Sequence, residues 1–260
     1  MKIKDKQAGS HSQTLLRGLS ILKCFDETNE SLSVTDLAKR TGIPQPTVWR
    51  FCQTLQSAGY LTNDTAKTLF RPGLALLSLG FSAISHFDLT QHARRYLVEL
   101  AEKFTVVAGI TAREALRMRV VDRHQAINAV LSYNSRVGAA LPMATTASGW
   151  AYLAGLEAGD RNLLITQIAK EQPDLWELAK QPFNKALGRF RKEGVIVSSG
   201  TIERGLTTVA IPISSPGSDA IYPLYCSAIS AALPETIIKA KLTPALKEIA
   251  AELRLALAVR

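Results

Sequence analysis

Residues 42–61 read GIPQPTVWRFCQTLQSAGYL, and their periodicity is the clearest structural signal in the chain. At about 100° per residue, the apolar side chains gather on one face of a helix: Val48, Phe51, Cys52 and Leu55. The opposite face is largely polar and carries Pro46, Trp49, Arg50, Gln53 and Ser57. Proline suits the first turn of a helix, because no N–H is needed there and its fixed φ is already helical. We therefore expect a helix that starts close to Pro46 and buries only one face.

The segments around this helix give the order of a winged helix-turn-helix. In chain order they are a helix over 12–26, a short helix over 33–42, hairpin strands over 60–62 and 69–71, and an apolar helix over 73–87. Ser33 is placed to cap the short helix with Asp36 three residues on, and Gly42 is placed to end it. The first helix is expected to bury one apolar face: Leu15, Leu16, Leu19 and Leu22.

The polar face of the 46–57 helix is suited to DNA. No acidic residue occurs from Gly42 to Asn63, so no carboxylate opposes phosphate there. Arg50 can pair with guanine or phosphate, and a glutamine can read adenine. The alternative is an ordinary solvated helix face, but the preceding capped helix and the following hairpin favour DNA binding. The candidate DNA-binding residues are Gln45, Pro46, Thr47, Trp49, Arg50, Gln53 and Arg71, the last from the second hairpin strand.

The remainder of the chain has a different pattern of predicted helices and strands. Its expected elements are a helix over 89–104, strands over 106–112, 116–122 and 125–132, a loop over 138–142, helices near 143–156, 159–170 and 182–193, strands over 207–214 and 220–230, and a helix over 234–258. Strands and helices are segregated rather than alternating, which predicts an α+β fold with an antiparallel sheet. The expected division is a flexible tail over 1–11, a DNA-binding domain over 12–72, a linker helix over 73–87 and a second domain over 88–260.

The composition is compatible with a polyanionic partner and predicts no membrane-spanning segment. The net charge is +9; residues 1–87 hold 10 Lys and Arg against 6 Asp and Glu, and residues 88–260 hold 21 against 16. No run of about 18 apolar residues is present, so no transmembrane helix is expected. Three scattered cysteines, Cys24, Cys52 and Cys226, indicate free thiols in a reducing compartment, hence the cytoplasm. No CxxC or HxxxH spacing occurs, so we expect neither a metal nor a cofactor.

Four motifs in order resemble the IclR family of bacterial transcriptional regulators. They are SLSVTDLAKRTGIPQPTVWRFCQTLQSAGYL at 31–61, LFRPGLALLSLG at 69–80, LPMATTASGWAYLAGL at 141–156 and GVIVSSGTIERGLTTVAIPI at 194–213. The resemblance implies a winged helix-turn-helix domain, a linker helix and a GAF-like effector-binding domain. It also implies homodimers, or dimers of such dimers, on a double-stranded DNA operator, with a small organic or aromatic acid as effector.

Some positions depart from the family pattern. Gln45 and Pro46 stand where the family usually has lysine and serine, and Trp150 stands where lysine is commoner. Ser198 and Ser199 occupy a loop in which some members place an acidic effector contact. These differences bear on the strength of DNA contacts and on the identity of the effector.

The resemblance places the effector pocket between the sheet and the helix that begins near Ala147. The residues expected to line it are Met143, Thr145, Thr146, Ala147, Ser148, Ser198, Thr208, Tyr225 and Cys226. Their hydroxyls and the N–H groups of the helix start could hold a carboxylate. Alternative partners for an anion are Arg113, Arg117 and Arg119. The plainer interpretation is that these arginines lie on a solvent-exposed strand face. Tyr222, Tyr225 and Trp150 could stack on an aromatic ring or pack in the core.

Two other functions stay open at this point. One is a DNA-binding protein with a vestigial sensor domain, and the other is an enzyme with an appended DNA-binding module. Against an enzyme, the sequence has no GxSxG, no P-loop and no GxGxxG.

Overall fold

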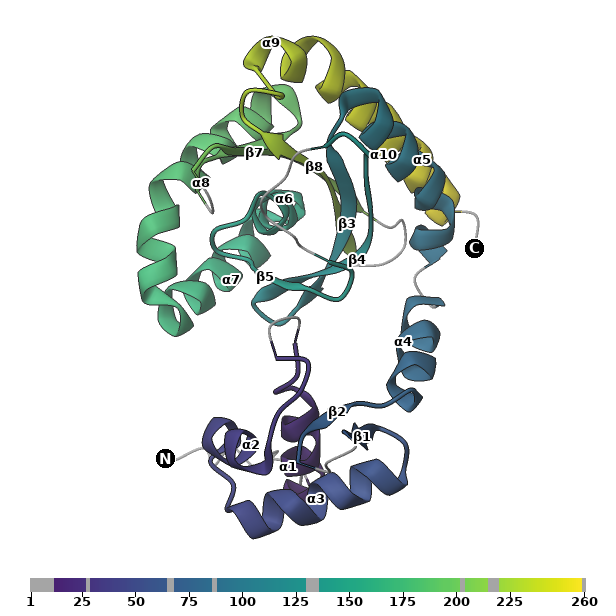
Figure 1. The fold of residues 1–260 in the computed structure, drawn as a ribbon. Coiled ribbons are helices and arrows are strands. Elements are labelled where there is room, and N and C mark those ends of the chain that lie inside the picture. Colours follow the sequence, from purple (N-terminus) through teal and green to yellow (C-terminus); the bar gives the residue numbers. More distant parts are fainter. Residues whose placement is uncertain are drawn as a thin grey trace, which may run out of the picture. The chain divides into compact units, whose positions relative to one another are not determined.

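The computed structural model describes residues 12–26, 29–64, 68–85, 88–129, 136–201, 204–214 and 220–258. The predicted tail over 1–11 lies outside this part of the chain. The described residues divide between two compact units, Met1–His86 and Phe87–Arg260. Helices cover a small hairpin in the first unit and a large antiparallel sheet in the second (Figure 1), so the α+β prediction is confirmed.

The first unit has the helix and strand order of a winged helix-turn-helix. Its elements are α1 (Gln13–Leu22), α2 (Val34–Thr41), α3 (Gln45–Ser57), β1 (Leu61–Asn63), β2 (Phe70–Pro72) and α4 (Ala75–Ser85). β1 and β2 pair antiparallel, and Leu32 adds a bridge to Phe70 at the edge of β2. A small core holds the unit together: Ile21, Leu32, Leu37, Ile43, Val48, Cys52, Leu61 and Phe70.

The predicted ends of α2 are confirmed in detail. The Ser33 hydroxyl accepts the Asp36 N–H at 3.2 Å, and the Asp36 carboxylate accepts the Ser33 N–H at 3.2 Å. Gly42 ends the helix with φ +69°, a left-handed conformation that glycine adopts at little cost. The turn into α3 is therefore fixed at both sides by local chemistry.

The prediction for the leucines of α1 is wrong for most of the helix. Leu15, Leu16 and Leu19 are 62%, 48% and 44% exposed, and Ile21 is the buried residue of α1. The reason is that the small core is reached by the C-terminal end of α1, while the N-terminal part extends beyond it. An apolar strip on α1 thus stays open on a single chain.

The second unit is a six-stranded antiparallel sheet in the order β5-β4-β3-β8-β7-β6. Its elements are α5 (Asp88–Phe104), β3 (Val107–Glu114), β4 (Arg117–Gln125), β5 (Ala140–Pro142), α6 (Ala147–Gly155), α7 (Ala158–Glu171), α8 (Pro173–Glu193), β6 (Ile196–Ser199), β7 (Leu206–Ser214), β8 (Ile221–Ile229), α9 (Glu235–Ile237) and α10 (Thr243–Ala258). A π-helical turn, Ile238–Leu242, joins α9 to α10. Figure 1 shows the sheet curving around α6, with α5 and α10 on its outer surface.

Each face of this sheet has its own core. Alternate residues of β8 show the division, because Leu224 and Cys226 pack with α5 and α10, whereas Tyr225 packs with α6 and α8. Both faces are covered, which explains why β7 and β8 are apolar along nearly their whole length.

Several local predictions differ from the structure, and the helix predicted near 182–193 begins at Pro173. Residues 126–129 are a turn rather than part of a strand, and residues 130–132 of that prediction lie outside the described residues. The predicted loop at 138–142 contains β5, which pairs with β4, and the short strand β6 was missed. These edge strands have only three or four residues, so their sequence carries too little periodicity to identify them.

Candidate functional site

The exposed face of α3 has the residues that periodicity places there. Val48 and Cys52 are fully buried, whereas Arg50, Gln53 and Ser57 are exposed and Trp49 is 44% exposed. Thr47 is half-buried at the edge of this face. The Arg50 guanidinium forms no ion pair among the described residues. The face is therefore polar, accessible and carries an uncompensated positive charge.

The start of α3 offers few N–H groups to an anion. The helix begins at Gln45, one residue before the expected start, with Pro44 as its N-cap. The Thr47 and Val48 N–H groups donate to the Pro44 carbonyl at 2.9 and 3.0 Å, and Pro46 has no N–H. The Gln45 side chain is turned toward α2, where its Nε2 donates to Thr35 Oγ1 at 2.9 Å. Phosphate binding at this helix tip would rest chiefly on side chains.

The hairpin that follows α3 is joined to it by an aromatic contact. The rings of Trp49 and Phe70 meet edge to face with centroids 5.9 Å apart, so Trp49 is partly a structural residue. Arg71 is exposed on β2 beside the buried Phe70. Asp64 bonds across the hairpin: its carboxylate accepts the N–H groups of Leu69 and Thr68, and these bonds, helped by the Arg71 charge, lower the pKa of Asp64.

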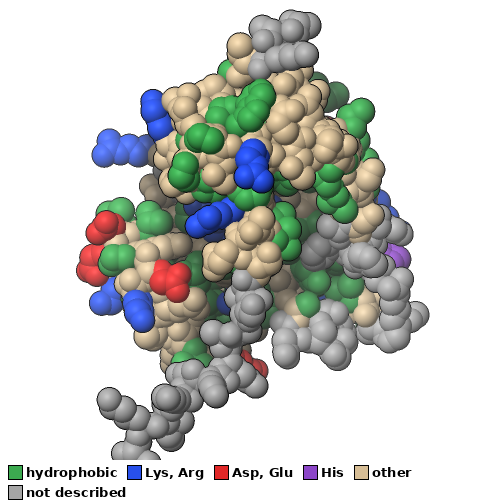
Figure 2. All heavy atoms as spheres, turned by 90° about the horizontal axis from the view of Figure 1, so that it is seen from below, with side chains coloured by type: hydrophobic (Ala, Val, Ile, Leu, Met, Phe, Trp, Pro, Cys, Tyr) green, Lys and Arg blue, Asp and Glu red, His purple; other side chains and the backbone are tan. Residues whose placement is uncertain are grey.

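The charge distribution on the surface suits a polyanion. Figure 2 looks at the chain from below, and Lys and Arg side chains stand out there from a largely uncharged surface that also carries a few Asp and Glu side chains. The acid-free stretch from Gly42 to Asn63 includes all of α3. The structure thus combines an exposed helix with a surface that does not repel phosphate.

In the second unit, three of the hydroxyl-bearing strand residues form one row. Ser198 of β6 pairs in register with Thr208 of β7, which pairs with Ser227 of β8. The Thr208 and Ser227 hydroxyls are hydrogen-bonded to each other, and Ser198 Oγ donates to Thr201 Oγ1 at 3.0 Å. The row lies on the same face as Tyr225, because Tyr225 and Ser227 are two residues apart on β8.

The predicted effector residues near α6 are deeply buried. Met143, Ala147 and Tyr225 belong to the single core on this side of the sheet. Thr146 is the N-cap of α6: its hydroxyl accepts the Gly149 N–H at 3.1 Å and donates to the Pro142 carbonyl at 2.8 Å. Ser148 is also buried, and Thr145 is half-buried. The structure thus places these side chains inside the unit rather than on its surface.

The structure separates Cys226 from this group. Cys226 faces α5 and α10, on the side of the sheet opposite to Tyr225, because neighbouring strand residues point to opposite faces. Tyr222 also packs on the α5 and α10 side. Trp150 donates its indole N–H to the Ala144 carbonyl at 2.6 Å and meets Phe183 edge to face, which makes it a core residue. The three aromatic residues suggested to stack on a ligand therefore do not share one site: Tyr222, Tyr225 and Trp150.

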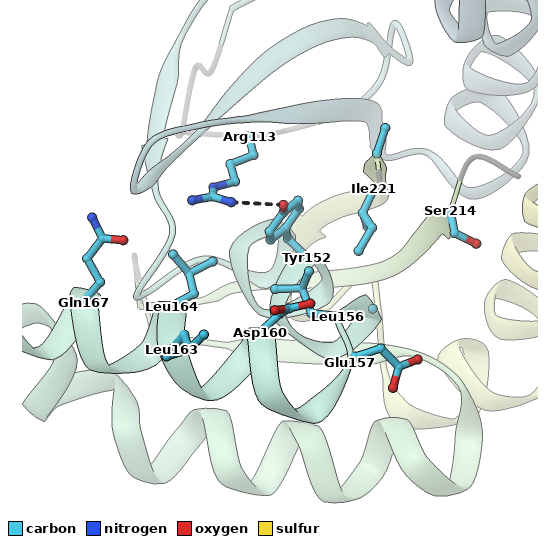
Figure 3. Close-up of a pocket in the computed structure, with 12 residues that line it drawn as sticks. Arg113, Tyr152, Leu156, Glu157, Asp160, Leu163, Leu164, Gln167, Ser214 and Ile221 are labelled. Carbon is cyan, nitrogen blue, oxygen red and sulfur yellow. Dashed lines mark hydrogen bonds between the residues drawn. The ribbon is translucent and has the colours of Figure 1, made fainter. Parts of the chain in front are cut away.

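The three alternative arginines have different surroundings. Arg119 forms an ion pair with Glu114, and Arg117 is exposed on β4. Arg113 lines a cavity of about 530 Å³ between α6, α7 and the ends of β7 and β8 (Figure 3). The sequence did not point to this cavity, since Arg113 comes together there with Tyr152 and with α7 residues far away in the chain.

Among the residues that the structure describes, no three His, Cys, Asp or Glu side chains are grouped as a metal site would need. Within the same residues no helix is long and apolar enough to span a bilayer.

Comparisons with known proteins agree over almost the whole chain. The family model "IclR helix-turn-helix domain" matches residues 14–65, and "Bacterial transcriptional regulator IclR C-terminal" matches residues 81–255. The HTH-type transcriptional regulator TsaQ1/TsaQ2 of Comamonas testosteroni is 31% identical over 243 residues, which are 93% of this chain and 87% of that protein.

Two further similarities extend the comparison. The p-hydroxybenzoate hydroxylase transcriptional activator of Acinetobacter baylyi is 28% identical over 259 residues, covering 92% of this chain and 90% of that protein. The crystal structure of an IclR family transcriptional regulator from Brucella abortus is 27% identical and superposes with a TM-score of 0.81, covering 95% of this chain and 93% of that one.

Proposed function

The chain belongs to the IclR family of bacterial transcriptional regulators, and from this premise we propose how it binds its operator and its effector. We propose that α3 enters the major groove of the operator and that the β1–β2 hairpin contacts the adjacent backbone. A small aromatic or organic acid bound in the second unit then changes the affinity for DNA. Whether transcription falls or rises depends on where the operator lies relative to the promoter.

The observation that carries the DNA-binding proposal is the exposed, acid-free face of α3. Arg50 stands on this face without an ion-pair partner among the described residues, and Gln53 is exposed beside it. A guanidinium and an amide are the groups that read base edges. The proposed DNA contacts are Gln45, Pro46, Thr47, Trp49, Arg50, Gln53 and Arg71. Arg50 and Gln53 are assigned to bases, and Thr47 and Arg71 to phosphates.

The effector is proposed to bind in the second unit, on the α6 side of the sheet. One relative is the transcriptional activator of p-hydroxybenzoate hydroxylase. This similarity supports an aromatic acid as the class of effector. The hydroxyl row of Ser198, Thr208 and Ser227 offers polar partners on that side. The remaining proposed contacts are Met143, Thr145, Thr146, Ala147, Ser148 and Tyr225. Cys226 is left out, because it faces the other side of the sheet.

We also propose that the protein acts as a dimer, with residues 12–72 binding DNA, 73–87 as linker and 88–260 as sensor. Leu15, Leu16 and Leu19 on α1 are exposed, as are Leu77 and Leu79 on α4 at 57% and 54%. Exposed leucines in two helices of one small unit are an unfavourable surface unless another subunit covers them. A dimer would also present two α3 helices to successive major grooves.

We propose that the protein regulates by binding alone and catalyses no reaction. We also propose that it acts in the cytoplasm, where the operator lies. The buried thiols support it, because burial raises the pKa values of both Cys52 and Cys226 and keeps them as unreactive thiols. The effector need only bind the two DNA-binding states with different affinities to act.

The test begins with an operator selected by the protein from a random duplex library. Thermal unfolding is then measured with 4-hydroxybenzoate, benzoate and a set of aliphatic acids. We expect saturable stabilisation by at least one acid, no product, and a change in operator affinity of about 5- to 150-fold. No stabilisation by any acid would indicate a vestigial sensor, and product formation would indicate an enzyme.

A further inference from the structure

The cavity beside Arg113 lies at the C-terminal end of α6 and the end of β7, apart from the hydroxyl row of the proposed effector site. It is bordered by Ser214 at the end of β7, whereas Thr208 of the hydroxyl row lies six residues earlier on the same strand. Six residues of a strand span roughly 20 Å. A volume of about 530 Å³ is within the range of small-molecule sites. The cavity is therefore distinct from the hydroxyl row, and the regulator function proposed above assigns no ligand to it.

A positioned positive charge lies on one side of this cavity. The Arg113 side chain extends from β3 over the ring of Tyr152, with its guanidinium carbon 5.7 Å from the ring centroid. Its Nε donates to the Ala115 carbonyl at 3.0 Å, and its Nη1 lies 3.5 Å from the Tyr152 hydroxyl (Figure 3). In the described part of the chain no carboxylate pairs with Arg113. The guanidinium is held in place and still has donors for an anion.

Negative charge lies on the other side. Asp160, in the first turn of α7, faces the cavity from below Arg113 in Figure 3, and Glu157 stands at the rim. Neither carboxylate forms an ion pair with a described cation. Opposite charges line one cavity without neutralising each other, and a ligand that carries both charges would satisfy both sides.

Beside the two charges, the rest of the cavity wall is largely apolar. Leu163 is 72% exposed at the cavity, while Leu164 and Ile221 are nearly buried in its floor. Leu156 and Tyr152 continue this surface. Burying an apolar group against these side chains would add affinity and remove Leu163 from water.

We propose that this cavity is a second ligand site, which binds a free α-amino acid with a large apolar side chain. Arg113 takes the carboxylate through charge-assisted hydrogen bonds, Asp160 takes the ammonium group, and the leucines contact the side chain. A simple carboxylic acid satisfies only one of the two charges. The site therefore discriminates against the acids proposed as effectors.

Calorimetric titration of the full chain with L-leucine tests this proposal. The comparison ligands are 4-methylpentanoate, which lacks the ammonium group, and 3-methylbutylamine, which lacks the carboxylate. We expect L-leucine to bind saturably and each comparison ligand to bind about tenfold more weakly or worse. No saturable binding at about 10 mM L-leucine, or equal affinity for 4-methylpentanoate, would overturn the assignment.

Variants locate the binding. Arg113→Gln and Asp160→Asn should each weaken L-leucine binding about tenfold or more. The matched controls Arg117→Gln on β4 and Asp174→Asn on α8 lie outside the cavity lining and should leave it unchanged. Thr208→Val should also leave it unchanged, which separates this site from the effector site. Loss of binding in Thr208→Val but not in Arg113→Gln would contradict the proposal, with thermal unfolding showing that each variant is folded.

Discussion

The ring of Tyr225 lies directly against Gly109 on the neighbouring strand. The two residues are partners in the register of β3 and β8, and a Cβ atom built on Gly109 would lie 2.6 Å from the tyrosine hydroxyl oxygen. The absence of a side chain at 109 thus leaves the space that the aromatic ring occupies. The ring faces the core on the α6 side of the sheet, among the proposed effector residues.

Gly109→Ala should destabilise the second unit by about 1–3 kcal/mol, because the added methyl group overpacks the Tyr225 ring. The free energy of unfolding is measured by urea denaturation. Gly188→Ala is the matched control: nothing lies within 4 Å of its Cβ position in α8, so alanine should be neutral or slightly stabilising. Equal effects of both substitutions would show that the ring does not set the cost.

Arg50→Ala should weaken binding to the selected operator by about 1–3 kcal/mol and relax the preference at one base pair. The reason is that Arg50 is the exposed cation of α3. Binding is measured by fluorescence anisotropy at fixed salt on the operator and its single-base variants. Arg191→Ala in α8 removes the same charge from the second unit and should have little effect. Unchanged affinity in a folded Arg50→Ala protein would remove Arg50 from the interface.

Arg71→Ala should weaken binding by about the same factor for the operator and for a random duplex. The reason is that a phosphate contact carries no sequence information. The slope of log K against log salt should become shallower by about 1. Affinity for operator and random duplex is compared over a salt series. A change in base preference with an unchanged slope would place Arg71 at a base rather than at the backbone.

Pro46→Ser should tighten DNA binding several-fold at low salt. Thr47 and Val48 already donate their N–H groups to Pro44, so serine at 46 adds an N–H and a hydroxyl where the helix start has few free donors. Operator affinity of the variant is compared with that of Pro46→Ala, which restores the N–H alone. If neither variant gains affinity, the helix tip does not approach a phosphate.

The stability of the first unit should fall between pH 9 and pH 11 partly through Cys52. Burial, with a smaller effect of Cys24, raises the pKa of the Cys52 thiol from 9.0 to about 11. The folded state keeps its proton in this range while the unfolded state loses it, so this stabilising contribution is complete below the unfolded pKa and is lost as pH rises. Denaturation of Cys52→Ala should show a flatter dependence over the same pH range. Parallel curves for the two proteins would show that Cys52 does not contribute.

Local chemistry was enough to predict the first unit. Ser33, Asp36 and Gly42 set the ends of α2 through bonds within a few residues, and the 3.6-residue period of α3 fixed which face is buried. The leucines of α1 were the exception, because the same period does not say whether the covering surface is in this chain or in another. The short strands β5 and β6 were missed for lack of periodicity.

The amino-acid sequence by itself determined the family, the α+β class and the polar face of α3, since each depends on residues close together in the chain. The tertiary structure decided which strand residues share a space. It put Cys226 on the side opposite to Tyr225, paired Thr208 with Ser227, and brought Arg113 to a cavity with Tyr152 and Asp160. Strand register and sheet curvature set these neighbours, and both arise from contacts between segments that no local pattern encodes.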